Sequence, residues 1–479
     1  MNIRINLTVA LFLLCSVTVA AKDSIPLNAV NRAGEVIDAA IEAYGGSERL
    51  AGIKTVLRES DFKTWATNQS LTPGPPWDQS VQKNFAAVDF ENKIFIGRQE
   101  GSQGGFEFKT AQIIKGEQGW NLDYRSGTVT DQPSPDFNNA AGPLIRVTAP
   151  LLVKQLQERR HTSYWLGEVK LDGRPHDIIT LVMEAGPALS LYFDRDSHML
   201  SRSERVLPPF GQVDYRFAQY HKIDGIPFAA SFQLFVNDEP NLDIKYSRTM
   251  VNQNLEPYAE ISDTLKALEG VAQPTEVELA EIAPGVYLIG AAGTYALFVE
   301  MDDHILAVGG TAGVPERIKK LRDSGQNKPI KYAVLTHHHN DHLLAVPAWD
   351  EEGAVLFTVK ANEKVVREQA SDGSVLDLQF IKDKHVFEGG QRVEIHNIGP
   401  TPHAQDLLVA YLPEHGLLFE ADHFPNPLNG QIIPAQPVTV RLAAVIDELG
   451  LKVTHIVGAH SSRVATIDDL RQSLASKAK

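Results

Sequence analysis

The side chains best suited to chemistry gather in one short segment, His337-His338-His339-Asn340-Asp341-His342. The segment follows an apolar stretch, 330–335, whose composition predicts a buried strand. A loop at the end of a strand turns successive side chains in different directions, so His337 and His339 can face one metal ion. Asp341 and His342 can face a second ion. Ligand-type side chains at this density are costly to desolvate unless a cation compensates them, and the segment therefore predicts a metal site.

The segment matches the HxHxDH signature of the metallo-β-lactamase superfamily, and the rest of the C-terminal region resembles that family in the same order. The resemblance implies a dinuclear site that two further histidines and a bridging carboxylate complete. These further ligands are His403 within 400–413, Asp422 at the end of 417–422 and His460 at the end of 456–460. The implied ligands of one ion are His337, His339 and His403. The implied ligands of the other ion are Asp341, His342 and His460, with Asp422 between the two ions.

Imidazole and carboxylate ligands favour zinc, although the same set can hold iron or manganese. The resemblance therefore implies two zinc ions, with iron and manganese as alternatives. Binding to such a metal lowers the pKa of water from about 15.7 to about 7, so a hydroxide shared by the two ions is a nucleophile at neutral pH. We expect Asp341 to orient this hydroxide and to pass its proton to the leaving group.

The sequence identifies the subfamily within this superfamily less clearly than it identifies the metal site. Val308-Gly309-Gly310, Leu343-Leu344 and Ala404 depart from the common pattern, although none of them is an expected ligand. Asp422 argues against lactam hydrolysis and, with the triple histidine, resembles glyoxalase II and the lactonases. A lactonase-type tyrosine shortly after Asp422 is missing. The expected substrate is a small molecule with an ester, lactone, thioester or alkyl sulfate bond, and an apolar one is favoured.

Two further histidines lie beside expected ligands. His338 lies between two of them, and we expect it to line the mouth of the site or to bond to backbone. His423 follows Asp422, so it is either a pocket residue or a buried histidine with satisfied partners.

Strands and helices alternate in the C-terminal region. Apolar stretches at 285–290, 296–300 and 304–308 predict strands, and 315–324 predicts a helix that begins with proline and ends before glycine. This alternation predicts an α/β domain with a buried sheet. The family resemblance makes it an αββα sandwich over residues 276–479.

The N-terminal region has a different pattern, with short alternating runs separated by Gly, Pro, Asn and Asp. This pattern predicts a mainly antiparallel β domain over 22–258 that follows a helix at 33–44. Through the helix that ends at Ala43-Tyr44-Gly45-Gly46 and the segments 193–197 and 220–227, the domain resembles the half-barrels of periplasmic lipoprotein-sorting proteins. This resemblance implies a role in binding an apolar ligand, although an accessory sheet is at least equally consistent. Gly101 to Gly105 predicts a hairpin turn, and 259–275 predicts a linker with a helix from Ala259 to Leu268.

The composition and the first residues restrict the partners and the compartment. With 43% hydrophobic and 22% charged residues among 479, the chain is globular, and its net charge of −15 argues against nucleic acid as a partner. Residues 1–21 predict a signal peptide, so we expect a periplasmic or secreted protein without a stable membrane anchor. Removal of the signal peptide takes away the only cysteine, Cys15, so a metal must bind to His, Asp and Glu.

The combined expectation is an exported dinuclear zinc hydrolase. One alternative keeps the fold but uses iron for redox chemistry, and the identity of the metal would separate the two. A second alternative is a lipid-binding or apolar-ligand-binding protein with an inactive metal site. The sequence does not define the oligomeric state.

Overall fold

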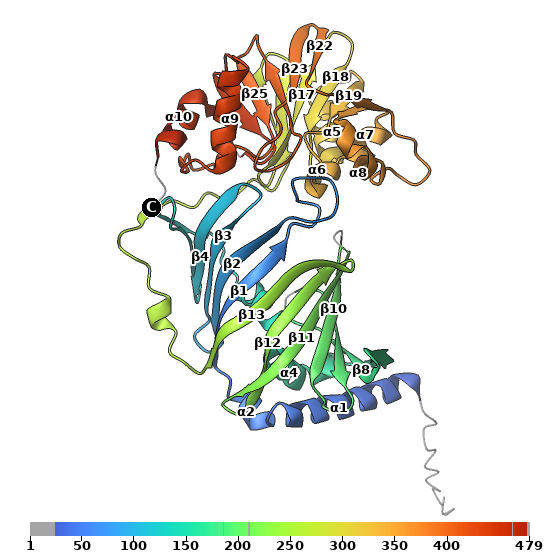
Figure 1. Cartoon of the computed structure of the whole chain (residues 1–479), viewed down its shortest axis with the longest axis vertical. Helices are drawn as coiled ribbons and strands as arrows, with labels where there is room; N and C mark the ends of the chain where they lie inside the picture. The colour runs from blue at the N-terminus through green and yellow to red at the C-terminus, as the bar shows by residue number, and fades with distance from the viewer. Residues whose placement is uncertain (1–23, 185, 209–210, 462, 477–479) are drawn as a thin grey trace, which may run out of the picture.

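The computed structural model describes residues 24–184, 186–208, 211–461 and 463–476. The expected signal peptide lies outside the described residues. Within the described ranges, no helix is long and apolar enough to span a membrane. Figure 1 shows the N-terminal β domain below and the C-terminal domain above it.

The N-terminal domain contains one sheet of 14 strands. The strands are β1 Thr55–Trp65, β2 Gln79–Asp89, β3 Ile94–Gln103, β4 Phe106–Lys115, β5 Gln118–Asp123, β6 Thr128–Asp131, β7 Trp165–Leu171, β8 Arg174–Leu181, β9 Leu189–Asp194, β10 Leu200–Leu207, β11 Gly211–Ile223, β12 Ile226–Val236, β13 Glu239–Val251 and β14 Lys266–Leu268. Their order is β14-β6-β5-β4-β3-β2-β1-β13-β12-β11-β10-β9-β8-β7. The sheet has two free edges, β14 and β7, so it is an open, mainly antiparallel sheet, as the sequence predicted.

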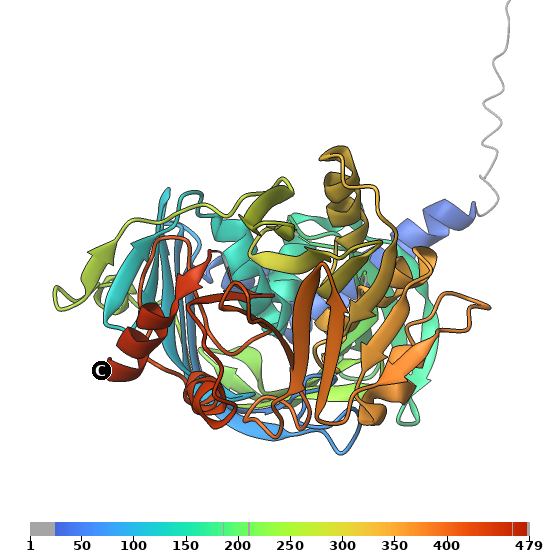
Figure 2. The ribbon, with the colours of Figure 1, turned by 90° about the horizontal axis from the view of Figure 1, so that it is seen from above.

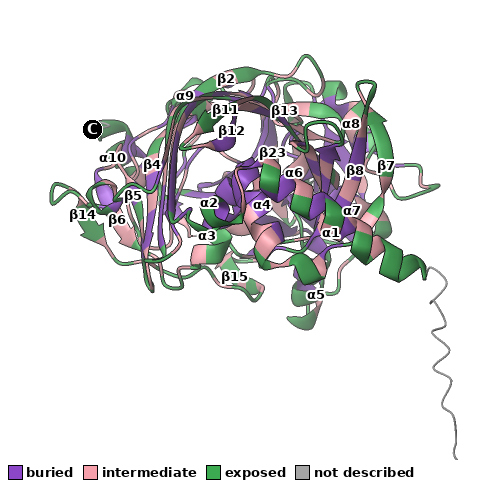
Figure 3. Cartoon of the chain, turned by 90° about the horizontal axis from the view of Figure 1, so that it is seen from below, coloured by how far each residue is buried: buried purple, intermediate pink, exposed green. Residues whose placement is uncertain are grey.

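The sheet curls around the helices of its own domain, as the view from below shows (Figure 3). These helices are α1 Ile25–Ala43, α2 Ser47–Ala51, α3 Phe137–Arg146 and α4 Ala149–Glu158, with single 3-10 turns at Arg160–Thr162 and Glu256–Tyr258. The expected helix at 33–44 is the second part of α1, which begins earlier because Ser24 caps it and Pro26 lies in its first turn. Apolar side chains of α1 and α4 pack with strand residues such as Phe193 and Phe228 in one buried core.

The helix predicted from Ala259 to Leu268 is wrong. This segment contains no α-helix, and its end forms β14, which pairs in parallel with β6. Ile261 and Leu265 pack against the buried core around Leu57 and Ile96. We attribute the difference to this packing and pairing, which override the weak helical pattern of a segment containing Ser, Asp and Thr.

The C-terminal domain has two sheets packed face to face. The first consists of β15 Glu278–Ala283, β16 Val286–Ala291, β17 Thr294–Glu300, β18 Ile305–Gly309, β19 Ile330–Val334, β20 Val355–Thr358 and β21 Leu378–Phe380. The second consists of β22 Lys384–Gly389, β23 Gln391–Asn397, β24 Leu408–Leu412, β25 Leu417–Glu420, β26 His455–Gly458 and β27 Ala465–Thr466. Leu297 and Val334 of the first sheet share a core with Ile395 and Phe419 of the second.

Helices cover the outer faces of both sheets. They are α5 Val314–Asp323, α6 Asn340–Leu343, α7 Val346–Glu351, α8 Glu363–Arg367, α9 Pro437–Glu448 and α10 Ile467–Ala475, with a 3-10 turn at Lys360–Asn362. Ile318 of α5 and Trp349 of α7 pack against the first sheet, and Leu442 of α9 and Leu470 of α10 pack against the second. The resulting layers are the αββα sandwich that the sequence predicted.

Candidate metal centre

The expected ligands meet at one edge of the sandwich, each placed by the end of a strand or by the loop beside one. His337 follows β19, and Asp341 and His342 lie in α6, the short helix that His339 begins. His403 lies in the loop between β23 and β24. The Leu408 amide donates to the Thr336 carbonyl at 2.7 Å and so joins this loop to the segment after β19.

The last two ligands come from neighbouring parallel strands. Glu420 of β25 pairs with Gly458 of β26, so Asp422 and His460, each two residues further on, leave the sheet at the same edge. This register is the physical reason why residues 38 positions apart in the sequence can face each other.

The side chains form three overlapping groups whose ligand atoms lie close enough for one ion to bind each group. The groups are His337 with His339 and His403; His337 with His342 and Asp422; and Asp341 with His342 and His460. The first and third groups are the two ligand sets that the sequence analysis expected, and the second group contains the expected bridging carboxylate.

Asp422 lies at the centre of the whole cluster. Its Oδ2 atom is 3.5 Å from His337 Nε2, 3.6 Å from His403 Nε2 and 3.1 Å from His342 Nε2. Its Oδ1 atom is 3.4 Å from His460 Nε2. Two ligand atoms that share a tetrahedral zinc at its usual bond lengths are about 3.4 Å apart, so these separations fit ligands of a common ion.

Unpaired buried atoms point to the same conclusion. Within the described residues, His337 Nε2, His403 Nε2 and Asp422 Oδ2 are buried and have no hydrogen-bond partner. A buried polar atom without a partner costs about 1–3 kcal/mol, and three such atoms converge here. The residues present therefore fit a bound cation.

The N-terminal domain determines which nitrogen of two histidines is free for a metal. The Gly104 carbonyl accepts a hydrogen bond from His403 Nδ1 at 2.9 Å, and the Ser70 carbonyl accepts one from His339 Nε2 at 3.1 Å. A carbonyl can only accept, so each of these nitrogens carries a proton. The opposite nitrogen, Nε2 of His403 and Nδ1 of His339, then keeps its lone pair for a metal.

The same domain also contacts the α6 segment. The Gln69 amide donates to Asp341 Oδ1 at 2.8 Å and to Asn340 Oδ1 at 2.6 Å. His338 Nε2 donates to the Ser70 carbonyl at 2.8 Å, so the expectation that His338 bonds to backbone is confirmed. Sequence analysis missed Gln69, Ser70 and Gly104, because two of them act through backbone carbonyls and nothing in their local sequence indicates the contact.

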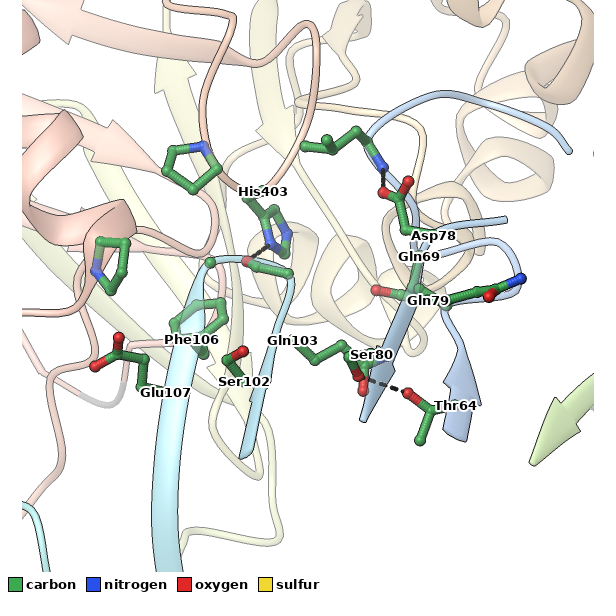
Figure 4. Close-up of a pocket in the computed structure, with 16 residues that line it drawn as sticks. Thr64, Gln69, Asp78, Gln79, Ser80, Ser102, Gln103, Phe106, Glu107 and His403 are labelled. Atoms are coloured by element: carbon green, nitrogen blue, oxygen red, sulfur yellow. Dashed lines mark hydrogen bonds between the residues drawn. The ribbon is translucent and has the colours of Figure 1, made fainter. Parts of the chain in front are cut away.

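A cleft of about 390 Å³ lies below His403, between the two domains (Figure 4). Loop 66–78, the turn between β3 and β4, and the segment at Pro402 line it. This turn is formed by Gly104-Gly105, as predicted for Gly101 to Gly105, although the first three of these residues belong to β3. Of the expected ligands, His403 lines this cleft.

Burial and neighbouring charges hold three of the expected ligands, His337, His339 and Asp422, in the metal-binding form. Burial lowers the pKa of His337 well below its usual value and lowers that of His339 to about 2, so both imidazoles are neutral. Burial would raise the pKa of Asp422, but the charge of His342 and the close approach of His342 and His403 outweigh it and hold that pKa well below its usual range. The carboxylate is therefore ionised at neutral pH.

His423 is fully buried beside the cluster, with its ring 5.9 Å from that of His403. Neither ring nitrogen has a hydrogen-bond partner among the described residues. Burial lowers the pKa of His423 to about 3, so the ring is neutral. The interpretation of His423 as a buried histidine with satisfied partners is therefore wrong, because the ring packs beside His403 instead of finding a polar neighbour.

Glu420 supplies a prediction about pH. Its side chain is buried and accepts a hydrogen bond from the His423 amide at 2.5 Å, and burial raises its pKa from 4.5 to about 8. The folded state therefore holds this proton more tightly than the unfolded state. The stability that protonated Glu420 contributes is lost as the pH rises through the window from 4.5 to about 8. In chelator-treated protein we expect Glu420→Gln to gain stability over the wild type by up to ~1.4 kcal/mol per pH unit across the window.

Urea unfolding of both proteins at several pH values measures this difference. Glu414→Gln is the matched control because Glu414 is exposed on the turn before β25. Parallel stability profiles for wild type and Glu420→Gln would contradict the prediction.

The comparisons agree with this geometry. The model of the metallo-beta-lactamase superfamily matches residues 308–475, which include all seven expected ligands. No curated protein sequence matches the chain. The C-terminal domain therefore has the metallo-β-lactamase fold, a fold of metal-dependent hydrolases and oxidoreductases, with a histidine-rich group placed to hold metal.

Several solved structures are similar to part of the chain. A metallo-beta-lactamase from Pontibacter korlensis is 21% identical with a TM-score of 0.34, over 42% of this chain and 98% of that one. The metallo-beta-lactamase FIM-1 from Pseudomonas aeruginosa, in a mono-zinc form, is also 21% identical with a TM-score of 0.34, over 42% and 95%. Rubredoxin oxygen:oxidoreductase from Desulfovibrio gigas is 16% identical with a TM-score of 0.35, over 41% and 60%.

Proposed function

We propose that the protein is an exported hydrolase that binds two zinc ions and cleaves an ester, lactone, thioester or similar bond in a small molecule. The observation that carries the proposal is the convergence of four imidazoles on the Asp422 carboxylate at 3.1–3.6 Å. The export part rests on the leader-like sequence of residues 1–21.

The residues divide between two ion positions. His337, His339 and His403 would hold one ion, Asp341, His342 and His460 would hold the other, and Asp422 would contact both. Bound there, the ions would supply Lewis acidity and lower the pKa of water. The donor set without sulfur suits zinc, and it also suits iron and manganese.

Substrate approach is favoured on the side of Asp341 and His460. Their side chains are 38% and 33% exposed, whereas His337 and His342 are buried. Burial would raise the pKa of Asp341, but hydrogen bonds from His460 and Gln69 and the charge of His342 outweigh it and lower that pKa. Asp341 is therefore ionised at neutral pH, the form in which it can hold an ion or orient a water molecule by accepting its hydrogen bond.

Metal analysis by mass spectrometry on the purified protein tests the proposal, with turnover of generic ester, lactone and thioester substrates measured on the same samples. We expect about two zinc ions per chain, as in dinuclear hydrolases. In His339→Ala we expect loss of zinc together with activity, because the variant removes one imidazole of the first group. His161→Ala is the matched control, because His161 is exposed in the N-terminal domain.

Other results would overturn the proposal in distinct ways. Iron in place of zinc, with no turnover of these substrates, would favour redox chemistry on the same fold. A chain without metal would favour a binding protein with an inactive metal site.

A further inference from the structure

The concave side of the N-terminal sheet encloses a large cavity of about 1230 Å³. The aromatic and aliphatic part of its wall comes from β11, β12 and β13 and includes Tyr215, Phe232, Leu242, Ile244 and Tyr246. The amide-rich part comes from β2, β3, β4 and β5 and includes Gln82, Asn84, Gln99, Gln112 and Asn121. We call this cavity the chamber. A wall of this mixed kind suits an organic molecule with both apolar and polar groups.

Two arginines that line the chamber, Arg146 and Arg205, each contact Tyr215. Arg146, the last residue of α3, shares a side-chain hydrogen bond with Tyr215, and the Arg205 guanidinium lies 5.9 Å from the centre of the Tyr215 ring. Arg205 Nε is buried and has no hydrogen-bond partner within the described residues. The two guanidinium groups thus face the same part of the chamber with unused donor capacity.

Among the described residues, no carboxylate neutralises this pair. Within the part of the chain that the structure describes, neither Arg146 nor Arg205 forms an ion pair with a carboxylate. The two acidic residues of the chamber wall are engaged locally: Asp136 caps α3, and Asp123 accepts from the amides of the turn that follows it. Arg58, a third arginine in the wall, donates only to neutral acceptors and stacks on Tyr246, so it adds positive charge without a counter-ion.

The opposite face of the same strands shows the contrast. Arg202 pairs with Glu204 and Asp214, and Arg216 pairs with Asp214 at 2.8 Å. Because side chains alternate along a strand, Arg205 faces the chamber while Arg202 and Glu204 face away. Arginines on the outer face therefore have carboxylate partners, whereas those in the chamber do not.

Adjacent like charges in a partly buried wall are unfavourable unless an anion compensates them. Burial, followed by the charge of Arg205, lowers the pKa of Arg146. The effect of Arg205 on this pKa is the repulsion between the two guanidinium groups. The guanidinium fork binds carboxylate, sulfate or phosphate groups through two parallel hydrogen bonds. We propose that the chamber binds an organic anion whose acidic group lies between Arg146 and Arg205 and whose aromatic or aliphatic body packs on the wall beside Tyr215.

The chamber shares part of its wall with the cleft below His403. Thr64 and Gln103 line both the chamber and the cleft below His403. Gln431 of the C-terminal domain also lines the chamber and donates to Thr128 Oγ1 at 3.1 Å. Figure 2 shows the C-terminal domain seated over the N-terminal sheet. The bound anion is therefore part of the substrate or product of the proposed hydrolase, an assignment that rests on the function proposed above.

Binding to chelator-treated protein tests the chamber independently of catalysis. The probe is anilinonaphthalene sulfonate, and the neutral comparison is phenylnaphthylamine, which has the same aromatic body without the sulfonate. We expect saturable sulfonate binding that Arg146→Gln and Arg205→Gln each weaken by about ten-fold or more, as for loss of a hydrogen bond to a charged group. Phenylnaphthylamine affinity should change less than about two-fold, since the apolar wall is intact.

Arg248→Gln is the matched control, because Arg248 pairs with Glu59 and is 45% exposed. Circular dichroism of each variant verifies folding, and Arg205→Lys keeps the charge if Arg205→Gln fails to fold. Sulfonate affinity that is equal in wild type and both chamber variants would overturn the proposal. Equal affinity of wild type for the sulfonate and the neutral amine would also overturn it, since the chamber would then bind apolar bodies without regard to charge.

The chamber proposal and the hydrolase proposal can be refuted independently. Arginine-dependent sulfonate binding in a protein without hydrolase activity would leave the chamber proposal standing and refute only the hydrolase. Turnover of esters by wild type, with kcat/KM for anionic and neutral substrates equally unaffected in both variants, would refute the chamber and leave the hydrolase.

Discussion

Replacement of Asp422 by asparagine is expected to lower kcat/KM by at least about 1000-fold, equivalent to about 4 kcal/mol of transition-state stabilisation. The variant keeps the size of the side chain but removes the negative charge that four imidazoles approach at 3.1–3.6 Å. Without this charge, both ion positions lose a common ligand, and we expect the metal content to fall with activity. Metal analysis and steady-state kinetics on the same preparation measure both effects.

The matched control is Asp447→Asn, because Asp447 is an exposed carboxylate on α9. Thermal unfolding of the two variants separates loss of metal from loss of fold. Full metal content and unchanged kcat/KM in Asp422→Asn would show that this carboxylate does not bridge a working centre.

Replacement of Gly105 by alanine is expected to weaken metal binding by about 10–100-fold, the usual effect of losing a hydrogen bond that orients a ligand. A Cβ atom on Gly105 would lie 2.5 Å from Val438 Cγ1 and 2.8 Å from Pro402 Cβ, and its φ of +81° already disfavours a side chain. The turn must move away from the C-terminal domain, and the Gly104 carbonyl then leaves His403 Nδ1. Zinc affinity is measured by competition with a chromophoric chelator.

Gly116→Ala is the control for backbone strain. Gly116 occupies the turn between β4 and β5 with φ of +60°, and a Cβ atom there would have no neighbour within 4 Å. We expect this variant to lose about 1 kcal/mol of stability and to keep its zinc affinity. Equal zinc affinities of Gly105→Ala and Gly116→Ala would mean that contact with the N-terminal domain does not position His403.

The C-terminal fold and its expected ligands could be predicted because their signals are local. A dense histidine segment after an apolar strand predicts a metal site from residue types alone, whereas His403, Asp422 and His460 were implied by the resemblance to the superfamily. The segment that begins at Ala259 was predicted wrongly because its conformation depends on residues distant in the sequence. Its pairing with β6 and its contacts with a distant core outweigh the local propensity.

The sequence by itself determined the dense segment of ligand-type residues and the two kinds of domain, because both depend on composition and spacing over a few residues. The order of the further ligands came from the resemblance to the superfamily. Only the tertiary structure placed the N-terminal domain beside the candidate metal centre. There Gln69 contacts Asp341, 272 positions away in the sequence, and Gly104 contacts His403, 299 positions away. Only the structure separated the arginines with carboxylate partners from the pair in the chamber. Backbone carbonyls have no side-chain signature, and the partners of a charge depend on which strands lie side by side, so both follow from packing between residues distant in sequence.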